Sequence, residues 1–362
     1  ASQNGRGRRS CQNSKGDRMK VIAFHQSSDL YGSSRSFRRT LVALSSTYGE
    51  ENMTVVLPKD GPLYDELVAD GHAVLIKDLY IASRHVTRIR AIPRNFLRLV
   101  RSFSRVLSAC RPYDLVYVNT IVIWDVLLAL LFFRGKKIVH VREILPRIPA
   151  KVLNWYLRAA RIRTICNSRS TGKALFLRQS SYHRVIWNGT PQFPPAKTVG
   201  PAYGDEPLNV LCVGRINGWK GQVILAKAIR TAVEQLGPNV LSVRFVGDAL
   251  PHQHRYVDEL NHEIRRHKLE LITELMGFAT DLSQQYSWAQ VVVVPSVRPE
   301  PFGLVAIEAM SAGLPVIASE IGGLSEIVEH NVTGLLVPPN DPIELGQAII
   351  RLAKDRVTLA SM

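Results

Sequence analysis

The chain has 362 residues, of which 46% are hydrophobic and 21% are charged, and its formal net charge is +16. This length suffices for two domains, and this composition excludes a largely disordered protein. No apolar run approaches the roughly 20 residues that span a bilayer, so we expect no spanning helix. No signal-peptide pattern is visible either. Residues 1–190 hold 32 basic and 12 acidic side chains, whereas residues 191–362 hold 14 and 18. A basic first half favours a polyanionic partner: a membrane surface, a phosphorylated acceptor or a nucleic acid.

The four cysteines, Cys11, Cys110, Cys166 and Cys212, lack the spacing of a metal site. Cys166 and Cys212 fall within strand-like runs. We therefore expect buried free thiols in a reducing compartment.

Residues 1–18 are polar and basic without periodicity, which predicts a disordered tail, and Met19 resembles a natural start. Residues 20–25 form a predicted strand, followed by a Gly/Ser loop that contains Gly32 and Ser33 and by a helix beginning near Arg35. This order is typical of a Rossmann opening, although the loop lacks G-x-G-x-x-G, so a dinucleotide site is weakly supported. The loop is either a point of close approach to phosphate or an ordinary turn with a capping serine.

Further strand-like runs alternate with helical stretches and predict a parallel sheet covered on both faces. They occupy residues 54–57, 73–76, 115–119 and 137–141. His140 lies at the end of the fourth of these runs. A lone histidine there is often a hydrogen-bonded structural residue, and the nearby Arg142 and Glu143 could form a local ion pair.

An arginine-rich helix is predicted over residues 92–107, with Pro93 in its first turn. Its apolar face is predicted to contain Phe96, Leu99, Val100, Phe103 and Leu107. A second face carries Arg94, Arg98, Arg101 and Arg105, and no acid occurs from 84 to 105. This arginine stripe is either a solvated surface or a patch for anionic lipid head groups or a lipid diphosphate.

A Pro/Gly-rich linker at 191–207 precedes a second alternating unit. Its first strand is predicted at 208–213, and Arg215 and Lys220 follow it among glycines. A guanidinium and an ammonium at the carboxyl end of a strand suit a diphosphate, although they could be plain surface cations. His252 and His254, in a later loop, are expected to be ordinary polar residues.

Residues 295–317 contain more candidate ligand-binding features than any other stretch of the chain. A buried strand at 291–294 is followed by a short loop and by a helix that begins at Gly303 and ends near Gly313. A helix N-terminus at the carboxyl edge of a parallel sheet is an anion site, and glycine permits close approach of a phosphate. Glu300 and Glu308 flank it, and carboxylates accept hydrogen bonds from paired sugar hydroxyls. Alternatively, one glutamate pairs with the helix dipole and the other is solvated.

The segment PEPFGLVAIEAMSAGLPVIAS, with GGLSEIV and NVTGLLVPPND after it, closely resembles glycosyltransferase family 4. The resemblance is specific over residues 208–345 and weaker from residue 20. It implies a retaining, nucleotide-sugar-dependent enzyme of the α/β GT-B fold, in which the parallel sheets of two Rossmann-like domains face an interdomain cleft. We expect an acceptor domain at 19–190 and a donor domain at 208–362. Family members usually continue with a helix that crosses back to the first domain, so we expect truncation at Met362.

The resemblance also implies roles for individual residues. Catalysis is assigned to Glu300 on the sugar, His140 near the sugar, and Arg215 with Lys220 on the diphosphate. Donor binding is assigned, besides Arg215 and Lys220, to Glu308 on the ribose, to Gly277 and Phe278 at the nucleobase, and to Gly32, Ser33, Phe302, Gly303 and Leu304. The expected donor is a UDP- or GDP-linked sugar.

No metal cofactor is expected, because the chain has no Asp-x-Asp pair of the kind used by metal-dependent GT-A transferases. The expected acceptor is a glycan or lipid-linked precursor at the inner face of an anionic membrane, with the protein cytoplasmic and peripherally bound. Nucleic acid is not expected, because no matching motif accompanies the arginines. A sugar-nucleotide epimerase and a non-catalytic sugar-nucleotide-binding or membrane-recruited subunit are the alternatives.

Overall fold

The computed structural model describes residues 19–81, 92–196, 206–237 and 239–362, excluding the side chains of residues 92–97 and 251. The predicted tail at 1–18 and most of the predicted linker lie outside these ranges. Two sheets are present, and every pairing recorded between their named strands is parallel. The two-sheet α/β architecture predicted from the sequence is confirmed.

The first sheet has the strand order β3-β2-β1-β4-β5-β6-β7. Its strands are β1 (Val21–Phe24), β2 (Met53–Leu57), β3 (Ala73–Ile76), β4 (Leu115–Val118), β5 (Lys136–Val141), β6 (Arg163–Cys166) and β7 (His183–Val185). Strands β1, β2 and β4 bury nearly all their side chains, because helices cover both faces. Strand β3 is at the edge and is largely exposed.

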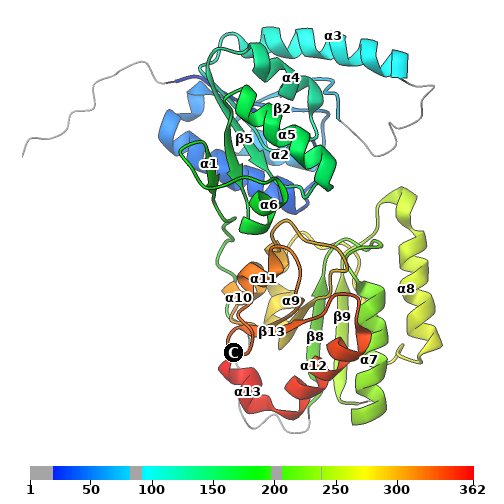
Figure 1. Ribbon diagram of the computed structural model, residues 1–362. Helices are drawn as coiled ribbons and strands as arrows, with labels where there is room; N and C mark the ends of the chain where they lie inside the picture. Colours follow the sequence, from blue (N-terminus) through cyan, green and yellow to red (C-terminus); the bar gives the residue numbers. More distant parts are fainter. Residues whose placement is uncertain (1–18, 82–91, 197–205, 238) are drawn as a thin grey trace, which may run out of the picture. The chain divides into compact units, whose positions relative to one another are not determined.

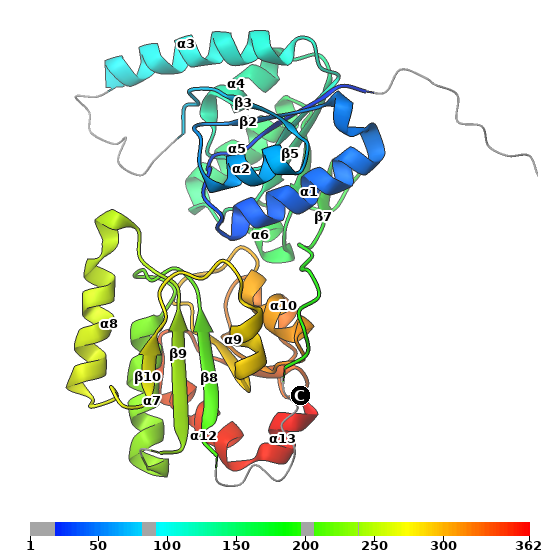
Figure 2. The same ribbon diagram turned by 180° about the vertical axis from the view of Figure 1, so that it is seen from behind.

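Four helices accompany strands β1 to β4: α1 (Gly32–Tyr48), α2 (Pro62–Ala69), α3 (Ile92–Cys110) and α4 (Trp124–Phe132). Helices α1 and α2 pack on one face of the sheet through Phe37, Leu41, Leu63 and Leu67. Helices α3 and α4 lie on the opposite face, as Figures 1 and 2 show from two sides, and Phe103 contacts Phe132 edge to face. Helices α5 (Arg147–Ala159) and α6 (Arg169–Ala174) follow β5 and β6.

The second sheet has the order β10-β9-β8-β11-β12-β13. Its strands are β8 (Leu208–Val213), β9 (Leu241–Val246), β10 (Thr273–Leu275), β11 (Val291–Val294), β12 (Val316–Ser319) and β13 (Gly334–Val337). Helices α7 (Gln222–Leu236), α8 (Arg255–Arg266) and α12 (Pro342–Lys354) form one core with it. Helices α9 (Ser283–Trp288), α10 (Leu304–Ser311) and α11 (Leu324–Ile327) pack on the other face (Figure 1).

Local sequence sets several helix starts. Asp341 accepts hydrogen bonds from the backbone N–H groups of Ile343 and Glu344, and Pro342 occupies the first turn of α12. This is a standard N-terminal cap followed by proline. Helix α13 (Arg356–Ser361) is capped in turn by Asp355.

The prediction of buried free thiols is confirmed for the described cysteines, Cys110, Cys166 and Cys212. A reducing compartment stays a prediction. Burial raises the pKa of each thiol to about 12. Within the ranges that the structure covers, no helix combines the length and apolar character needed to cross a bilayer.

Candidate donor site

The second sheet has one point where the strand order reverses. Strands β9 and β10 are added in turn on one side of β8, and β11 then pairs with β8 on its other side. In open parallel sheets, ligands bind beyond the carboxyl ends of the two strands at such a switch point. The loops that follow β8 and β11 carry Arg215, Lys220 and Glu300, so the topology brings the predicted residues to one edge.

Lys220 and Glu300 meet directly at this edge. The ammonium Nζ of Lys220 lies 2.6 Å from Oε1 of Glu300, and their side chains are only 19% and 7% exposed. The hydroxyl of Ser296, two residues after the end of β11, donates to the same carboxylate oxygen at 2.5 Å. A lysine ammonium has three donors, so its pairing with Glu300 leaves two for a phosphate.

The loop after β8 is fixed by its own backbone. The side-chain Oδ1 of Asn217 accepts hydrogen bonds from the N–H groups of Trp219 (3.1 Å) and Lys220 (3.0 Å), a turn that asparagine favours. The carbonyl of Trp219 accepts from the N–H of Val297 at 2.9 Å, which joins the two loops. Lys220 is therefore held in place before any ligand arrives.

Helix α10 begins beside this pair. Gly303 is its N-terminal cap with φ of +120°, a conformation that favours glycine, and a Cβ there would come within 2.6 Å of Leu324. The N-terminus of the eight-residue helix presents backbone N–H groups, which suit an anion. Phe302, just before the cap, is buried and serves packing as well as backbone placement.

Glu308 lies on α10 and is almost fully buried. Its Oε2 accepts a hydrogen bond from the hydroxyl of Tyr286 on α9 at 3.1 Å, so the carboxylate is oriented from a second helix. The alternative that Glu308 is a solvated helical residue is wrong. Burying a carboxylate costs free energy unless it is hydrogen-bonded, and the Tyr286 hydroxyl supplies one such bond.

Arg215 follows β8 and Gly277 follows β10, the two strands that lie on either side of β9. The carbonyl of Arg215 accepts from the side chain of Gln222 at 3.2 Å, and Ile216 N–H donates to Asp248 O beyond β9. Gly277 follows β10 with φ of +67°, and its carbonyl accepts from Gly247 N–H. Phe278 is half-exposed. All four ends of β8 to β11 thus lie at the edge where we place the donor.

His140, in β5 of the first sheet, is buried, and its Nδ1 lies 3.2 Å from the Arg142 guanidinium. Arginine can only donate, so Nδ1 accepts and the ring proton is assigned to Nε2. Burial and, secondarily, the charge of Arg142 hold the pKa of His140 well below its usual value, so the ring is neutral at physiological pH. Arg142 also donates to Asn188 at 2.8 Å, while the Glu143 carboxylate accepts from the Arg142 backbone N–H.

Gly32 and Ser33 lie at the corresponding point of the first sheet, after β1 and beside β4. Gly32 is the first residue of α1, which starts three residues earlier than predicted, and Tyr31 is its N-terminal cap. No side chain caps this helix, so the alternative of a capping serine is wrong. The helix start is held instead by Ser34, which bonds to His25 at 3.0 Å in a fully buried polar cluster.

The arginine stripe on α3 is only partly as predicted. Arg98 forms an ion pair with Asp78 at 2.6 Å, and Arg105 approaches the same carboxylate at 3.9 Å. Asp78 lies before the acid-free stretch, so sequence spacing alone could not place it there. The side chain of Arg94 lies outside those described. The predicted apolar face is also wrong at Val100, which is 43% exposed, whereas Ser102 and Val106 are buried.

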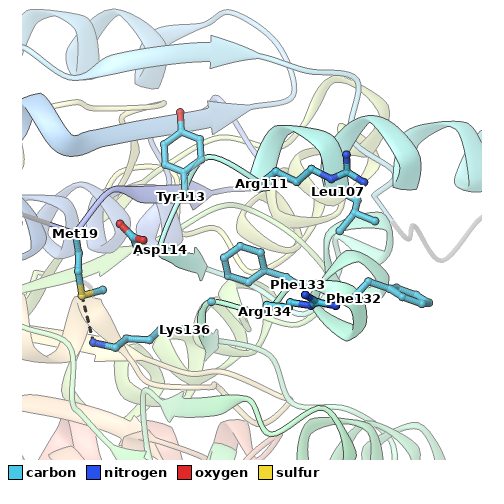
Figure 3. A pocket seen from close by; sticks show the side chains of 10 residues that line it. Met19, Leu107, Arg111, Tyr113, Asp114, Phe132, Phe133, Arg134 and Lys136 are labelled. Carbon is cyan, nitrogen blue, oxygen red and sulfur yellow. Dashed lines mark hydrogen bonds between the residues drawn. The ribbon is translucent and has the colours of Figure 1, made fainter. Parts of the chain in front are cut away.

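A basic hollow of about 1050 Å³ is present where the amino ends of strands β4 and β5 of the first sheet lie (Figure 3). Its lining includes Arg111, Arg134 and Lys136, and Asp114 and Lys136 stand at the amino ends of β4 and β5. Lys136 Nζ lies 3.2 Å from the sulfur of Met19, as Figure 3 shows. Because ligands of parallel sheets bind at the carboxyl edge, we do not assign the donor to this hollow.

Three residues of the donor site were missed from sequence: Ser296, Asn217 and Tyr286. Asn217 carried a local signal, since asparagine two residues before a tryptophan-lysine pair can form a side-chain turn. Tyr286 carried none, because it lies 22 positions from Glu308. In the part of the chain that the structure describes, no group of three or more histidine, cysteine or acidic side chains is placed to hold a metal.

Residues 207–355 match a family model described as "Glycosyl transferases group 1". Among curated proteins, an uncharacterized glycosyltransferase of Methanocaldococcus jannaschii is 36% identical over 152 residues, which are 42% of this chain and 37% of that protein. A D-inositol 3-phosphate glycosyltransferase of Corynebacterium glutamicum is 35% identical over 159 residues, 42% and 37% of the two chains. The matched segments thus span less than two-fifths of these relatives.

Among solved structures, Anabaena HepE in complex with UDP and glucose matches over 95% of this chain and 92% of its own, with a TM-score of 0.75 and 27% identity. Sucrose-phosphate synthase of Thermosynechococcus elongatus, at 23% identity and a TM-score of 0.70, shares the fold. The predicted resemblance is confirmed at the level of a glycosyltransferase, and the numbered family stays a prediction. Over residues 207–355 the chain matches the group 1 glycosyl transferases, and its two parallel sheets have the GT-B glycosyltransferase fold.

Proposed function

We propose that the chain transfers a sugar from a nucleotide-diphosphate donor to an acceptor hydroxyl, with retention of anomeric configuration. The observation that carries the proposal is the Lys220–Glu300 pair, set beside the α10 N-terminus at the switch point of the second sheet. Cations and backbone N–H groups suit a diphosphate, and carboxylates suit sugar and ribose hydroxyls. One edge thus offers partners for every part of a nucleotide sugar.

In this proposal Arg215, Lys220 and the α10 N-terminus bind the diphosphate, and Glu300 binds hydroxyls of the transferred sugar. Glu308, oriented by Tyr286, binds the ribose hydroxyls. The base lies against the backbone near Gly277 and Phe278. A uridine donor is favoured over guanosine because HepE, similar over nearly the whole chain, was solved with UDP-glucose.

The proposed mechanism of transfer follows from the charge that develops on the leaving diphosphate. As the bond between the sugar C1 and the diphosphate oxygen breaks, negative charge grows on the diphosphate and is stabilised by Lys220, Arg215 and the helix N-terminus. The acceptor oxygen bonds to C1 on the face that the diphosphate leaves. Its proton passes to a diphosphate oxygen, so retention needs no protein base. Neutral His140, protonated on Nε2, is proposed as a hydrogen-bond donor to the sugar.

The acceptor is proposed to be lipid-linked or a growing glycan, with the protein docked on the cytoplasmic face of an anionic membrane. Support comes from the +20 charge of residues 1–190 and from relatives such as an amylovoran biosynthesis glycosyltransferase of Erwinia amylovora. Polysaccharide biosynthesis is therefore the proposed setting.

UDP is expected to raise the melting temperature of the protein more than GDP does, since a ligand of the folded state stabilises it by mass action. Thermal shift with a panel of nucleotides and nucleotide sugars measures this. Arg215→Ala and Glu308→Ala are each expected to weaken UDP binding by about 10- to 100-fold. Unchanged affinity in both variants would refute the site. UDP binding without transfer to any acceptor would favour a non-catalytic sugar-nucleotide-binding subunit.

Transfer is expected to survive a strong chelator, because Arg215, Lys220 and a helix N-terminus supply the positive charge that a metal supplies in other transferases. Initial rates with and without EDTA test this, with a metal-dependent transferase as control. A complete loss of transfer that Mg²⁺ or Mn²⁺ restores would contradict the diphosphate roles of both cations.

A further inference from the structure

Helix α5 has an unusual composition for a surface helix. Its sequence, RIPAKVLNWYLRA, contains no acidic residue, and it lies in a longer acid-free stretch. Between Glu143 and Asp205 the chain has ten basic side chains and no acidic one. The helix can be followed in Figure 1, in green, within the part of the chain that forms the first sheet.

The solvent-facing side of α5 is apolar. Ile148, Val152 and Trp155 are 77%, 61% and 71% exposed, and their spacing of four and three places them on one stripe. Ala150 and Leu157 are fully buried and attach the helix to the fold. A soluble helix normally turns such large side chains inward, so α5 has apolar residues on both sides.

Cations border this stripe. Arg147, Lys151 and Arg158 are exposed on the same helix. Lys151 Nζ also lies 5.8 Å from the ring centre of Phe176, and Phe176 is itself 47% exposed. The side chain of Asn154 donates to the carbonyl of Leu175 at 2.6 Å, which fixes the turn carrying Phe176 against α5. The exposed patch therefore combines four large apolar side chains with three cations.

We propose that this α5 patch, Ile148, Val152, Trp155 and Phe176 with Arg147, Lys151 and Arg158, inserts into the head-group region of an anionic bilayer. Apolar side chains that include a tryptophan, bordered by cations, match the interface between acyl chains and acidic head groups. A protein partner would have to be both apolar and acidic. The inference deepens the membrane part of the proposed function, to which it gives an insertion element.

The α5 patch suits this role better than the arginine stripe on α3. Arg98 and Arg105 share one acidic partner, Asp78, which offsets part of their charge. Val100 is the large apolar side chain recorded as exposed among the described side chains of α3. Attraction by α3 would be purely electrostatic and would vanish with salt, whereas insertion of α5 would persist.

The test is cosedimentation of the purified chain with vesicles of phosphatidylcholine, alone or with one-quarter phosphatidylglycerol. Wild type is expected to bind the anionic vesicles and to retain part of that binding in high salt. Ile148→Glu and Trp155→Glu are each expected to lower the partition coefficient about tenfold or more. Ile343→Glu is the matched control, because Ile343 is also an exposed isoleucine, 63% against 77% for Ile148, and lies on α12. This variant is expected to bind like wild type.

Insertion is read directly from quenching of tryptophan fluorescence by brominated lipid, which Trp155→Phe is expected to reduce. Unchanged binding of Ile148→Glu, or quenching that survives Trp155→Phe, would overturn the proposal. The proposal would also be overturned if wild type bound no vesicles and formed a dimer that Ile148→Glu converts to a monomer. Thermal shift with UDP separates the two proposals. If UDP does not raise the melting temperature of wild type, the proposed donor site is refuted. The α5 patch is decided by the vesicle experiments, which do not depend on UDP binding.

Discussion

Glu300→Gln is expected to lower the rate of sugar transfer by about 10²- to 10³-fold while the protein still folds. The amide has nearly the same shape, but it cannot accept hydrogen bonds at both positions and carries no charge for Lys220. The ammonium, 2.6 Å away and mostly buried, then loses its counter-ion. We expect the free energy of unfolding to fall by about 1–3 kcal/mol. Initial rates with the best donor and urea unfolding curves measure the two effects.

A double-mutant cycle on Lys220 and Glu300 separates their effect on the transfer rate from their effect on stability. Lys220→Met alone leaves Glu300 buried without its cation, and it is expected to be destabilising as well. The combined Lys220→Met/Glu300→Gln variant is expected to recover most of the stability, because neither charge is then buried alone. Its transfer rate should stay low. If the double variant regained wild-type transfer, the pair would be a structural ion pair without a role on the substrate.

Gly221→Ala is expected to reduce the free energy of unfolding by about 3–5 kcal/mol, the sum of backbone strain and overlap. Gly221 caps the start of α7 with φ of +80°, and a Cβ there would lie 1.8 Å from the carbonyl oxygen of Pro295. The added methyl must push the β8 and β11 loops apart. Donor affinity should therefore fall together with stability, as chemical denaturation and UDP titration can measure.

The matched control is Gly237→Ala at the other end of the same helix. Gly237 also has a positive φ, +94°, but a Cβ there would meet nothing within 4 Å. Only the conformational penalty applies, about 1–3 kcal/mol, because φ of +94° with ψ of 165° is a combination that is essentially restricted to glycine. Equal losses of stability in the two variants would mean that the contact with Pro295 is relieved at little cost.

The parallel architecture was predictable because runs such as residues 291–294, VVVV, are buried on both faces and show no alternation. The anion site was predictable for a similar reason: Gly303 and the helix pattern after it are local in sequence. Both Lys220 and Glu300 were identified, but their direct contact was not. It depends on β11 returning to pair with β8, which no local pattern encodes.

Residues that act through distant partners escaped prediction. Tyr286 orients Glu308 from another helix, and Asp78 reaches Arg98 across 20 positions. The exposed stripe of α5 was also missed, because an apolar residue at helical spacing is normally assigned to the core. Only solvent exposure distinguishes Ile148 and Trp155 from core residues such as Leu157.

The hydrogen bond between Trp219 O and Val297 N–H has a consequence for how such a protein can diverge. It fixes the loops to which we assign diphosphate binding through main-chain atoms, which most substitutions leave in place. The loop after β10, with Gly277 and Phe278, stands two strands away from β8. Under the proposed function, mutations there can change the preferred base while the contacts assigned to the diphosphate stay intact. We therefore expect donor preference to diverge more readily at the β10 loop than at the loops after β8 and β11.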